Sequence, residues 1–356
     1  MPICKCKLFS YLLLHMNNKA INLSPSSDTG RLGVMHLKRY WEKSIARKTG
    51  RLSADALQEE WNTDITLLAA LGLGLEQTIK QVFLSPAGFN EFENWVLEIN
   101  GGELVQEKVE AFNESIAGNM PVETSSEIKN ILDAADIEFW NKNGYVILRN
   151  AVTKKDCDDT IDIICNYINI RKEDPSTWYN EHPARQGIMV QLFQHPLLEK
   201  NRQTKKIRKA YEQLWERKDI WVNTDRVGFN PPETDTWKFP GPGLHWDVSL
   251  QLPIPFGLQG ILYLSDTASN QGAFTLVPGF QNRIESWMNN FPTNANPRDQ
   301  DIYALGAIPV VANAGDFIIW HQALPHGSSP NTSSLPRFVQ YINYAPSDME
   351  VRDKWI

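Results

Sequence analysis

The sequence predicts an α+β protein in which short antiparallel strands form a sandwich or barrel that helices buttress, and in which an all-helical module comes first. Two patterns favour this fold. Apolar residues recur at helical spacing through residues 31–102, and short runs of β-branched and aromatic residues, divided by Gly, Pro and Asn turns, dominate residues 220–344. The chain has 356 residues, which is enough for about two domains of ordinary size.

The chain divides into four expected segments. Residues 1–30 end in a Ser/Pro/Gly-rich stretch that is typical of a flexible tail. Residues 31–102 predict the helical module, and residues 103–127 are polar and predict a connection. Residues 128–356 then predict the barrel domain. The aromatic stripe of the module favours packing or subunit contact as its role, with docking of a carrier or another partner as the alternative.

Four helices are expected in the module. Ser53 is a suitable N-cap, while Gly50 and Gly101 supply stops. Gly72 and Gly74 interrupt the third helix. The expected helices cover residues 37–45, 53–64, 65–83 and 86–99.

The barrel domain begins with helices and continues as strands. Thr153 is a good N-cap, and acidic residues follow it in the first turns, so a helix is expected from that position. Turn-forming stretches at 269–272, 278–279 and 314–316 separate the later strands. The expected helices cover residues 128–143, 153–168 and 197–216, and the expected strands cover residues 144–149, 187–193, 220–229, 248–252, 260–264, 273–277, 308–311, 316–320 and 337–344.

Composition limits the function classes. The net charge of −7 argues against a protein whose main role is to bind nucleic acid, because a basic domain would be expected there. No run approaches the ~20 apolar residues that span a bilayer, so no membrane partner is expected. The basic stretch 200–209 favours a solvated helix face, with a site for an anionic substrate group or an acidic carrier as the alternative. Cys157 and Cys165 lie about 12 Å apart along a predicted helix, too far for a disulfide, and a reduced, cytoplasmic protein is expected.

The stretch 239–250, Phe-Pro-Gly-Pro-Gly-Leu-His-Trp-Asp-Val-Ser-Leu, predicts half of a metal site. His245 and Asp247 stand two residues apart in a strand-like setting, so both side chains project from one face and can converge on one ion. The turn residues before them favour a position at the mouth of a sheet. The common structural alternative is a histidine that is hydrogen-bonded to a neighbouring carboxylate.

The stretch 315–331 predicts the other half, because it forms a strand that ends in a turn and offers His321 and His326. One carboxylate and two imidazoles, with three positions left open, are the ligand set of non-haem Fe(II) oxygenases. We take His326 as the third ligand, since His321 ends an apolar run and suits a hydrogen bond in the core. His245, Asp247 and His326 are called the ligand triad below.

Arg337 opens a predicted strand eleven residues after His326. A guanidinium at the edge of an apolar pocket needs an anion, and its planar fork suits a carboxylate. Ser328 is close enough in sequence to His326 to donate a second hydrogen bond to that anion. A surface salt bridge is the alternative role for Arg337.

Taken together, these residues resemble the phytanoyl-CoA dioxygenase (PhyH) family of Fe(II)/2-oxoglutarate-dependent oxygenases. The resemblance covers about residues 130–346 and implies a double-stranded β-helix, which is a distorted jelly roll, buttressed by helices. The motifs that carry it are His245-Trp-Asp247, the Gly-x-Phe-x-x-Val-Pro-Gly segment at 272–279, His326-Gly-Ser-x-x-Asn331, Arg337, and the opening strand 144–149.

The resemblance also implies the cofactors and the residues that bind them. The ligand triad would bind Fe(II), and Arg337 and Ser328 would bind the distal carboxylate of the co-substrate 2-oxoglutarate. Tyr263 falls where the family often has an aromatic residue beside the co-substrate. O₂ and 2-oxoglutarate would be consumed, succinate and CO₂ released, and an unactivated C–H bond of the substrate hydroxylated.

Other reactions stay open at this point. Asp247 disfavours halogenation, since related halogenases have a small residue in its place, but desaturation, epoxidation and ring formation use the same ligands. A Zn²⁺ hydrolase tolerates the same ligand triad, although Arg337 and the absence of a clear Glu general base count against it. A non-catalytic barrel that binds a metal or a small molecule is the third interpretation.

The substrate is expected to be a small molecule, either free or linked to a carrier or to CoA. Arg226, Asn230, Trp246 and Gln251 are candidate substrate contacts because they form a mixed aromatic and polar set near the ligand triad in sequence. Arg226 suits a substrate carboxylate, and pairing with Asp225 or Glu233 is its structural alternative.

Overall fold

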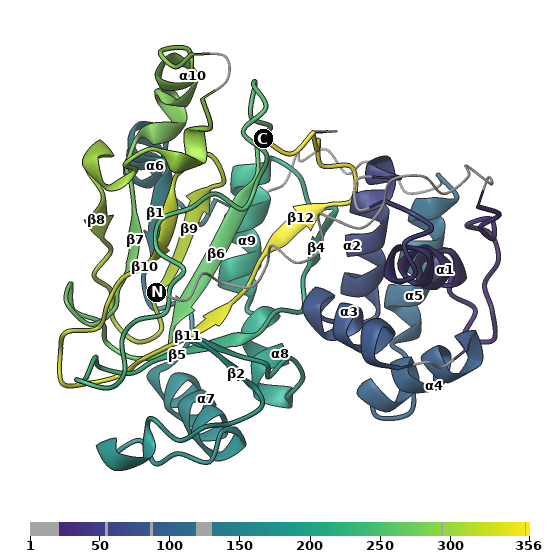
Figure 1. Ribbon diagram of the computed structural model, residues 1–356, viewed down its shortest axis with the longest axis horizontal. Helices are drawn as coiled ribbons and strands as arrows, with labels where there is room; N and C mark the ends of the chain where they lie inside the picture. The colour runs from purple at the N-terminus through teal and green to yellow at the C-terminus, as the bar shows by residue number, and fades with distance from the viewer. Residues whose placement is uncertain (1–20, 54–55, 86–87, 119–129, 293–294, 353) are drawn as a thin grey trace.

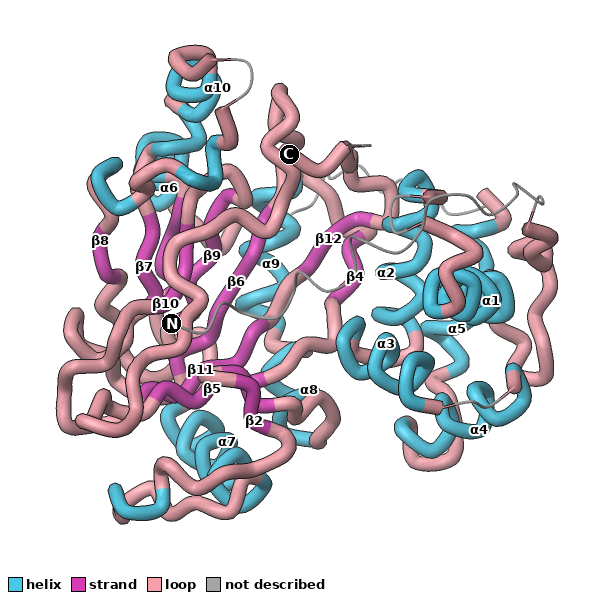
Figure 2. Tube along the Cα trace, viewed as in Figure 1, coloured by secondary structure: helices cyan, strands magenta, loops and turns pink. Residues whose placement is uncertain are grey.

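The computed structural model describes residues 21–53, 56–85, 88–118, 130–292, 295–352 and 354–356. Helices α1–α5 gather at one end of the molecule, and the strands with the remaining helices form the larger part beside them (Figure 1). Figure 2 shows the strands running through the centre of that larger part, with helices at its outer sides. The chain is therefore a mixed protein of helices and antiparallel sheets. Among the described residues, no helix is both long and apolar enough to cross a bilayer.

Helices α1–α5 share one apolar core, to which α5 contributes Val109 and Phe112. This helix lies in residues 103–127, where the sequence suggested a polar connection, because only two of its residues are buried and its other positions are polar. Residues 1–20 of the expected flexible tail lie outside the described residues, whereas Ser24 is fixed by two hydrogen bonds to Glu42. The helices are α1 Leu37–Lys48, α2 Trp61–Ala70, α3 Leu75–Leu84, α4 Phe89–Ile99 and α5 Gln106–Ile116, with a 3₁₀ helix at Gln58–Glu60.

The expected helices 53–64 and 65–83 are wrong in their boundaries. The chain instead forms α2 and α3 and breaks at residues 71–74 between them. Gly72 has a φ of +62°, a conformation that ends a helix at little cost only for glycine. The stronger stop signal was therefore the glycine pair, and not the change of polarity near Asp64.

The larger part contains three antiparallel sheets. One has seven strands in the order β1-β9-β6-β11-β5-β3-β2, one has three in the order β10-β7-β8, and one pairs β12 with β4. The strands are β1 Tyr145–Leu148, β2 Arg185–Gln186, β3 Met189–Val190, β4 Ile220–Val222, β5 Val227–Asn230, β6 Leu258–Tyr263, β7 Phe274–Leu276, β8 Ile308–Pro309, β9 Phe317–His321, β10 His326–Ser328, β11 Arg337–Tyr341 and β12 Tyr344–Pro346. The helices of this part are α6 Ala134–Asn143, α7 Lys154–Tyr167, α8 Pro196–Arg202, α9 Lys205–Trp215 and α10 Ile284–Met288, with 3₁₀ helices at Pro175–Thr177, Phe280–Asn282, Pro297–Asp299 and Tyr303–Leu305.

The seven-stranded sheet is buried on both faces. Along β6, Leu262 points into a core that includes α7, α8 and α9, whereas Ile261 and Tyr263 point into a core that includes the three-stranded sheet. In β9, Ile319 and Trp320 divide between the two cores in the same way. Successive side chains of a strand point to opposite faces, and both faces are apolar in these strands, so their sequences are continuous apolar runs. The second of the two cores leads to the candidate site.

Other expected elements also differ from the structure, and the expected strand 337–344 is divided between β11 and β12, which join different sheets. The expected strand 220–229 is two strands, β4 and β5, which join different sheets and leave residues 223–226 as a loop. The expected helix 197–216 is two helices, with Thr204 at the start of the second. The expected strand 248–252 does not form, because the guanidinium of Arg298, and not a neighbouring strand, binds the carbonyl oxygens of Trp246 and Val248.

Candidate active site

The structure brings the ligand triad together from two segments that pair at one point. The backbone N–H groups of His245 and His326 each donate to the other residue's carbonyl, at 2.8 and 3.0 Å. His326 begins β10, and His245 lies in the loop beside it. Their ring centroids are 4.9 Å apart, and one ligand atom from each residue of the triad lies within 4.8 Å of the others. This is a separation at which one cation can be bound by all three.

The two histidine rings are held so that the same nitrogen faces the site. His245 Nδ1 lies 2.7 Å from the carbonyl oxygen of Gly243, and His326 Nδ1 lies 3.0 Å from that of Leu324. A carbonyl only accepts, so each Nδ1 carries a proton, and each Nε2 faces Asp247, to which it donates when it is protonated as well; a metal ion would take the place of that second proton. Both Nε2 atoms are 3.2 Å from the carboxylate of Asp247. Fixing the ring through its other nitrogen is the usual support of a metal-binding histidine.

Gln259 holds the carboxylate of Asp247 in place, a role that the sequence did not predict. Its Nε2 donates to Asp247 Oδ2 at 2.8 Å, and its Oε1 accepts from the indole Nε1 of Trp320 at 3.1 Å. Partial burial alone would raise the pKa of Asp247, but the hydrogen bonds from His245 and His326 hold that pKa below its ordinary value. The carboxylate is therefore anionic, as a metal ligand must be.

His321 takes no part in this cluster. It ends β9, its ring packs against Trp140 and Phe256, and its Nδ1 accepts from the backbone N–H of Ala323 at 3.0 Å. Burial lowers the pKa of His321 to about 4. His321 is a neutral, half-buried histidine that packs against aromatic rings, and the choice of His326 as the third ligand stays a prediction.

Arg337 lies in the interior with two free donors. Its side chain is 1% exposed, and Nη2 donates to Ser328 Oγ at 2.9 Å, while Nε and Nη1 have no hydrogen-bond partner. Ser328 lines the cavity that also contains the ligand triad. Buried donors on a permanent cation are costly unless an anion binds them. Arg337 does not itself line that cavity but is linked to it through Ser328, so it fits a site for an anionic ligand that reaches past Ser328.

Tyr263 lies on β6, whose pairing with β11 places it opposite Val339, two residues after Arg337. Its hydroxyl donates to the carbonyl oxygen of Val310 and accepts from the N–H of Phe274, both at 2.9 Å. Burial raises the pKa of Tyr263 to about 12. The single hydroxyl proton is in use, so Tyr263 has none to offer a co-substrate, and Tyr263 is fully buried without lining the cavity at the ligand triad.

The cavity at the ligand triad has a volume of about 200 Å³. Phe274, Trp320 and Tyr341 supply aromatic wall, and Asp225 and Arg226 supply charge. An apolar cavity with a few convergent polar groups is the usual form of a small-molecule site.

Of the four candidate substrate contacts, only Arg226 lines this cavity. It pairs with Glu76, which the sequence did not suggest, and with Asp225 at 3.5 Å, which was one of the two expected partners. Trp246 follows His245 directly, so its indole points the other way, into the core between Phe280 and Trp287. Asn230 is fully buried behind the cavity and Gln251 lies away from it, so neither lines it.

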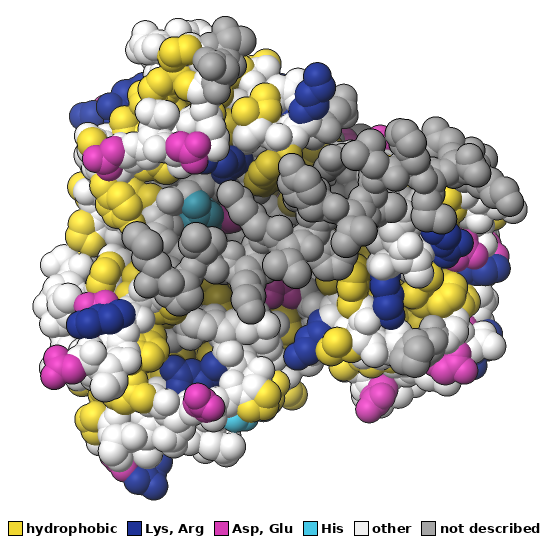
Figure 3. Space-filling view, viewed as in Figure 1, with side chains coloured by type: hydrophobic (Ala, Val, Ile, Leu, Met, Phe, Trp, Pro, Cys, Tyr) yellow, Lys and Arg dark blue, Asp and Glu magenta, His cyan; other side chains and the backbone are white. Residues whose placement is uncertain are grey.

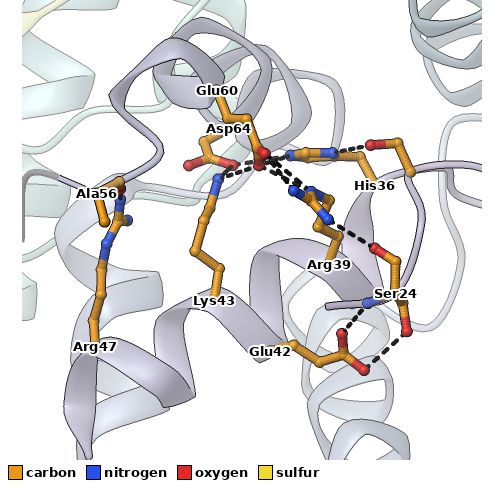
Figure 4. A network of polar contacts seen from close by, with 10 residues as sticks. Ser24, His36, Arg39, Glu42, Lys43, Arg47, Ala56, Glu60 and Asp64 are labelled. Atoms are coloured by element: carbon orange, nitrogen blue, oxygen red, sulfur yellow. Dashed lines mark hydrogen bonds and ion pairs between the residues drawn. The ribbon is translucent and has the colours of Figure 1, made fainter. Parts of the chain in front are cut away.

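A second cluster with metal-ligand spacing lies among the helices of the other part (Figure 4). His36 Nε2 is 3.0 Å from Asp64, while the fully buried Lys43 ammonium is 2.7 Å from Asp64 and 2.8 Å from Glu60. Arg39 lies 2.6 Å from Glu60. The two carboxylates are already neutralised by two cations, so this cluster is an ion-pair network and not a metal site.

Comparison with known proteins agrees with this geometry. The sequence model of the phytanoyl-CoA dioxygenase (PhyH) family matches residues 140–339, which is more than half of the chain. A protein of Dictyostelium discoideum that bears the same family's name is 24% identical over 262 residues, which are 59% of this chain and 74% of the relative.

Solved structures similar to this chain share little sequence with it. EctD from S. alaskensis is 15% identical, with a TM-score of 0.46 over 65% of this chain and 84% of EctD. AviO1 from Streptomyces viridochromogenes is 16% identical, with a TM-score of 0.42 over 62% of this chain and 99% of AviO1. The match over residues 140–339 contains the whole ligand triad, Ser328 and Arg337, and the chain belongs to the phytanoyl-CoA dioxygenase family of non-haem Fe(II)/2-oxoglutarate-dependent oxygenases.

Proposed function

We propose that this chain is a dioxygenase that hydroxylates, or otherwise oxidises, an unactivated C–H bond of a small-molecule substrate and releases succinate and CO₂. Arg337 is the observation that carries this proposal. It is a buried permanent cation with two free N–H donors, and its third nitrogen donates to Ser328 at the ligand-triad cavity. A dicarboxylate such as 2-oxoglutarate supplies the anion that these donors need.

The ligand triad fits iron. It offers two imidazole Nε2 atoms and one carboxylate, and all three residues line the cavity. Fe(II), when bound there with 2-oxoglutarate and O₂, supplies the oxidising power for attack on a C–H bond.

The chain's own residues would position the reactants. Gln259 orients the carboxylate of Asp247, and the carbonyl oxygens of Gly243 and Leu324 orient the two imidazole rings. Arg337 and Ser328 would bind the distal carboxylate of 2-oxoglutarate. Aromatic side chains along the cavity would exclude water from the reacting carbon.

The other interpretations leave these features without a use. A Zn²⁺ hydrolase, or a barrel that binds only a metal or a neutral molecule, needs no buried guanidinium with free donors next to the ligand triad. Leaving such donors unpaired costs about 1–3 kcal/mol each, so a bound anion explains the two unpaired donors of Arg337 better than these alternatives do.

We also infer that residues 128–356 form a distorted double-stranded β-helix. The apolar core shared by the seven-stranded and three-stranded sheets supports this, since it contains side chains from both. Residues 31–102, extended by α5, would form a helical module with its own core.

Anaerobic spectroscopy tests the function. Adding Fe(II) and then 2-oxoglutarate to the apo-protein should give a weak visible metal-to-ligand charge-transfer band, and air should then give succinate. Arg337→Ala should raise, by about 10–100-fold, the 2-oxoglutarate concentration at which the charge-transfer band reaches half of its maximal intensity. This is the change expected when a hydrogen-bonded charge pair of about 1.5–3 kcal/mol is lost.

The matched control is Arg51→Ala, which removes an exposed arginine of the helical part and should leave the titration unchanged. Circular dichroism and a thermal melt would show that each variant is folded. A folded, iron-loaded wild-type protein that gives no band and no succinate would exclude the proposed function.

A further inference from the structure

A second cavity, of about 270 Å³, lies between the helical part and the strands. Trp61, Ile65 and Leu68 of α2 form one side, and Trp221 of β4 forms another. Asp225 and Arg226 line this cavity and also line the cavity at the ligand triad. The two cavities therefore share part of the loop 223–226, between β4 and β5, as a common wall.

The helical part is held firmly against that loop. The backbone of Gly74, just before α3, forms a parallel bridge with Thr224. Gln77 and Gln194 exchange a side-chain hydrogen bond of 2.8 Å, and Phe112 meets Trp221 edge to face at 6.5 Å between ring centroids. In Figure 3 the molecule narrows between the helical and strand-rich parts, with acidic and basic side chains on both sides. The α2 wall of the cavity is thus a fixed part of the molecule.

One ion pair stands where the cavities meet. Arg226 Nη1 pairs with Glu76 in the first turn of α3, and Glu76 also accepts from Gln191 at 3.2 Å. Asp225 lies on the other side of the Arg226 guanidinium at 3.5 Å. Two carboxylates thus face the Arg226 guanidinium at this junction, which is called the neck below. The buried Arg202 donates to the carbonyl oxygen of Asp225 at 2.7 Å, so the cations and the carboxylates of the neck balance.

On the basis of the proposed function, we propose that the two cavities form one substrate site. The helical part binds the hydrocarbon portion of an elongated, uncharged substrate, and the Glu76–Arg226 pair controls passage through the neck. Each cavity alone is smaller than the ~300–1,000 Å³ of ordinary small-molecule sites, whereas together they fall within that range. Most of the second cavity's wall is apolar.

The charge of the neck sets the substrate class. Arg226 is already paired with Glu76, so it has little attraction left for a carboxylate or a phosphate, and an anionic group buried beside it would be left without a counterion. A neutral molecule with a long apolar portion passes at no such cost. An anionic group at the apolar end of the substrate is therefore selected against.

Calorimetric titration of the full chain without metal tests the site with two probes of equal chain length. Decan-1-ol should bind at least tenfold more tightly than decanoate at pH 7.5. Ile65→Trp fills the cavity from a half-buried position and should weaken binding of decan-1-ol at least tenfold. Glu76→Gln removes one carboxylate from the neck and should narrow the difference between the probes severalfold.

Glu107→Gln is the matched control, because Glu107 is an exposed glutamate in the first turn of α5, as Glu76 is in α3, but lines neither cavity. It should change neither probe's affinity. Decan-1-ol that binds equally well to folded Ile65→Trp protein, or no preference between the probes in the wild type, would overturn the inference.

Proton relaxation with Mn(II) in place of iron tests whether the cavities are joined. One end of bound decan-1-ol should relax faster than the other, because only one end reaches the ligand triad. Equal relaxation along the chain would exclude a joined site. If Mn(II) does not bind at all, the proposed function fails, whereas the calorimetry still decides on the cavity.

Discussion

Asp247 is half-exposed, with 52% of its side chain accessible, yet both of its oxygens have partners. His245 Nε2 approaches Oδ1, and His326 Nε2 approaches Oδ2, which also accepts from Gln259. The amide of Gln259 is fixed in turn by the indole of Trp320, whose side chain is in the core. The direction of the carboxylate therefore depends on a chain of two hydrogen bonds that starts in the core.

Gln259→Leu should weaken Fe(II) binding about 10–100-fold, which is the usual effect of losing an outer partner of a metal ligand. The variant frees the Asp247 carboxylate to rotate and leaves the Trp320 N–H without its acceptor. Anaerobic equilibrium dialysis with Fe(II) measures the effect. Gln203→Leu, at an exposed position after α8, is the control, and equal dissociation constants for the two variants would contradict this role.

At the residue scale, the sequence predicted which three side chains would converge, and their ligand atoms do lie within 4.8 Å. Their occupation by iron stays a prediction. Residue type and spacing sufficed because a His-x-Asp pair constrains its own geometry. Gln259 and the pairing of Arg226 with Glu76 were not predictable, since each depends on contacts between segments, the latter 150 residues apart.

At the scale of elements, α1 and α2 are joined by the ion-pair network of Figure 4. Glu60 precedes α2 and receives hydrogen bonds from Arg39 and Lys43 of α1. Burial alone would raise the pKa of Glu60, but these two hydrogen bonds lower that pKa from 4.5 to about 2. The carboxylate form is therefore favoured by folding.

A depressed folded-state pKa adds stability above pH 4.5 that is lost as the pH falls toward 2, and the difference is worth about 3 kcal/mol. Glu60→Gln should therefore be less stable than wild type at pH 6, and the gap should close by pH 2. Urea unfolding at several pH values, followed by far-ultraviolet circular dichroism, measures it. A gap that stays constant with pH would rule out the ionic contribution.

Elements whose partners are local were predictable, whereas elements defined by distant partners were not. The helix from Lys154 begins after Thr153, whose side chain accepts from the N–H of Asp156, as its sequence indicates. Residues 248–252 alternate like a strand, but Arg298 binds the carbonyl oxygens that a strand partner would need. Ser249 also accepts from the N–H of Ile356 and donates to the carbonyl of Lys354. The sequence of residues 248–252 alone therefore could not show that distant residues would bind these backbone groups in place of a strand.

At the scale of the whole molecule, the position of the helical part depends on a close approach at Gly74. A Cβ atom at this position would overlap the ring of Phe193, a side chain that is only 5% exposed. The φ of Gly74 is −77°, so the backbone itself tolerates any residue. Glycine is required there for space and not for conformation.

Gly74→Ala should therefore lower the free energy of unfolding by about 1–3 kcal/mol, the usual cost of overpacking a core contact. In a Phe193→Leu background the same substitution should cost at least 1 kcal/mol less, because the smaller side chain makes room for the methyl group. Chemical denaturation of the four proteins measures this coupling. Equal costs in both backgrounds would mean that the contact does not set how the helical part packs, and the α2 wall of the substrate site would then have to be fixed by the Gly74–Thr224 bridge and the glutamine pair alone.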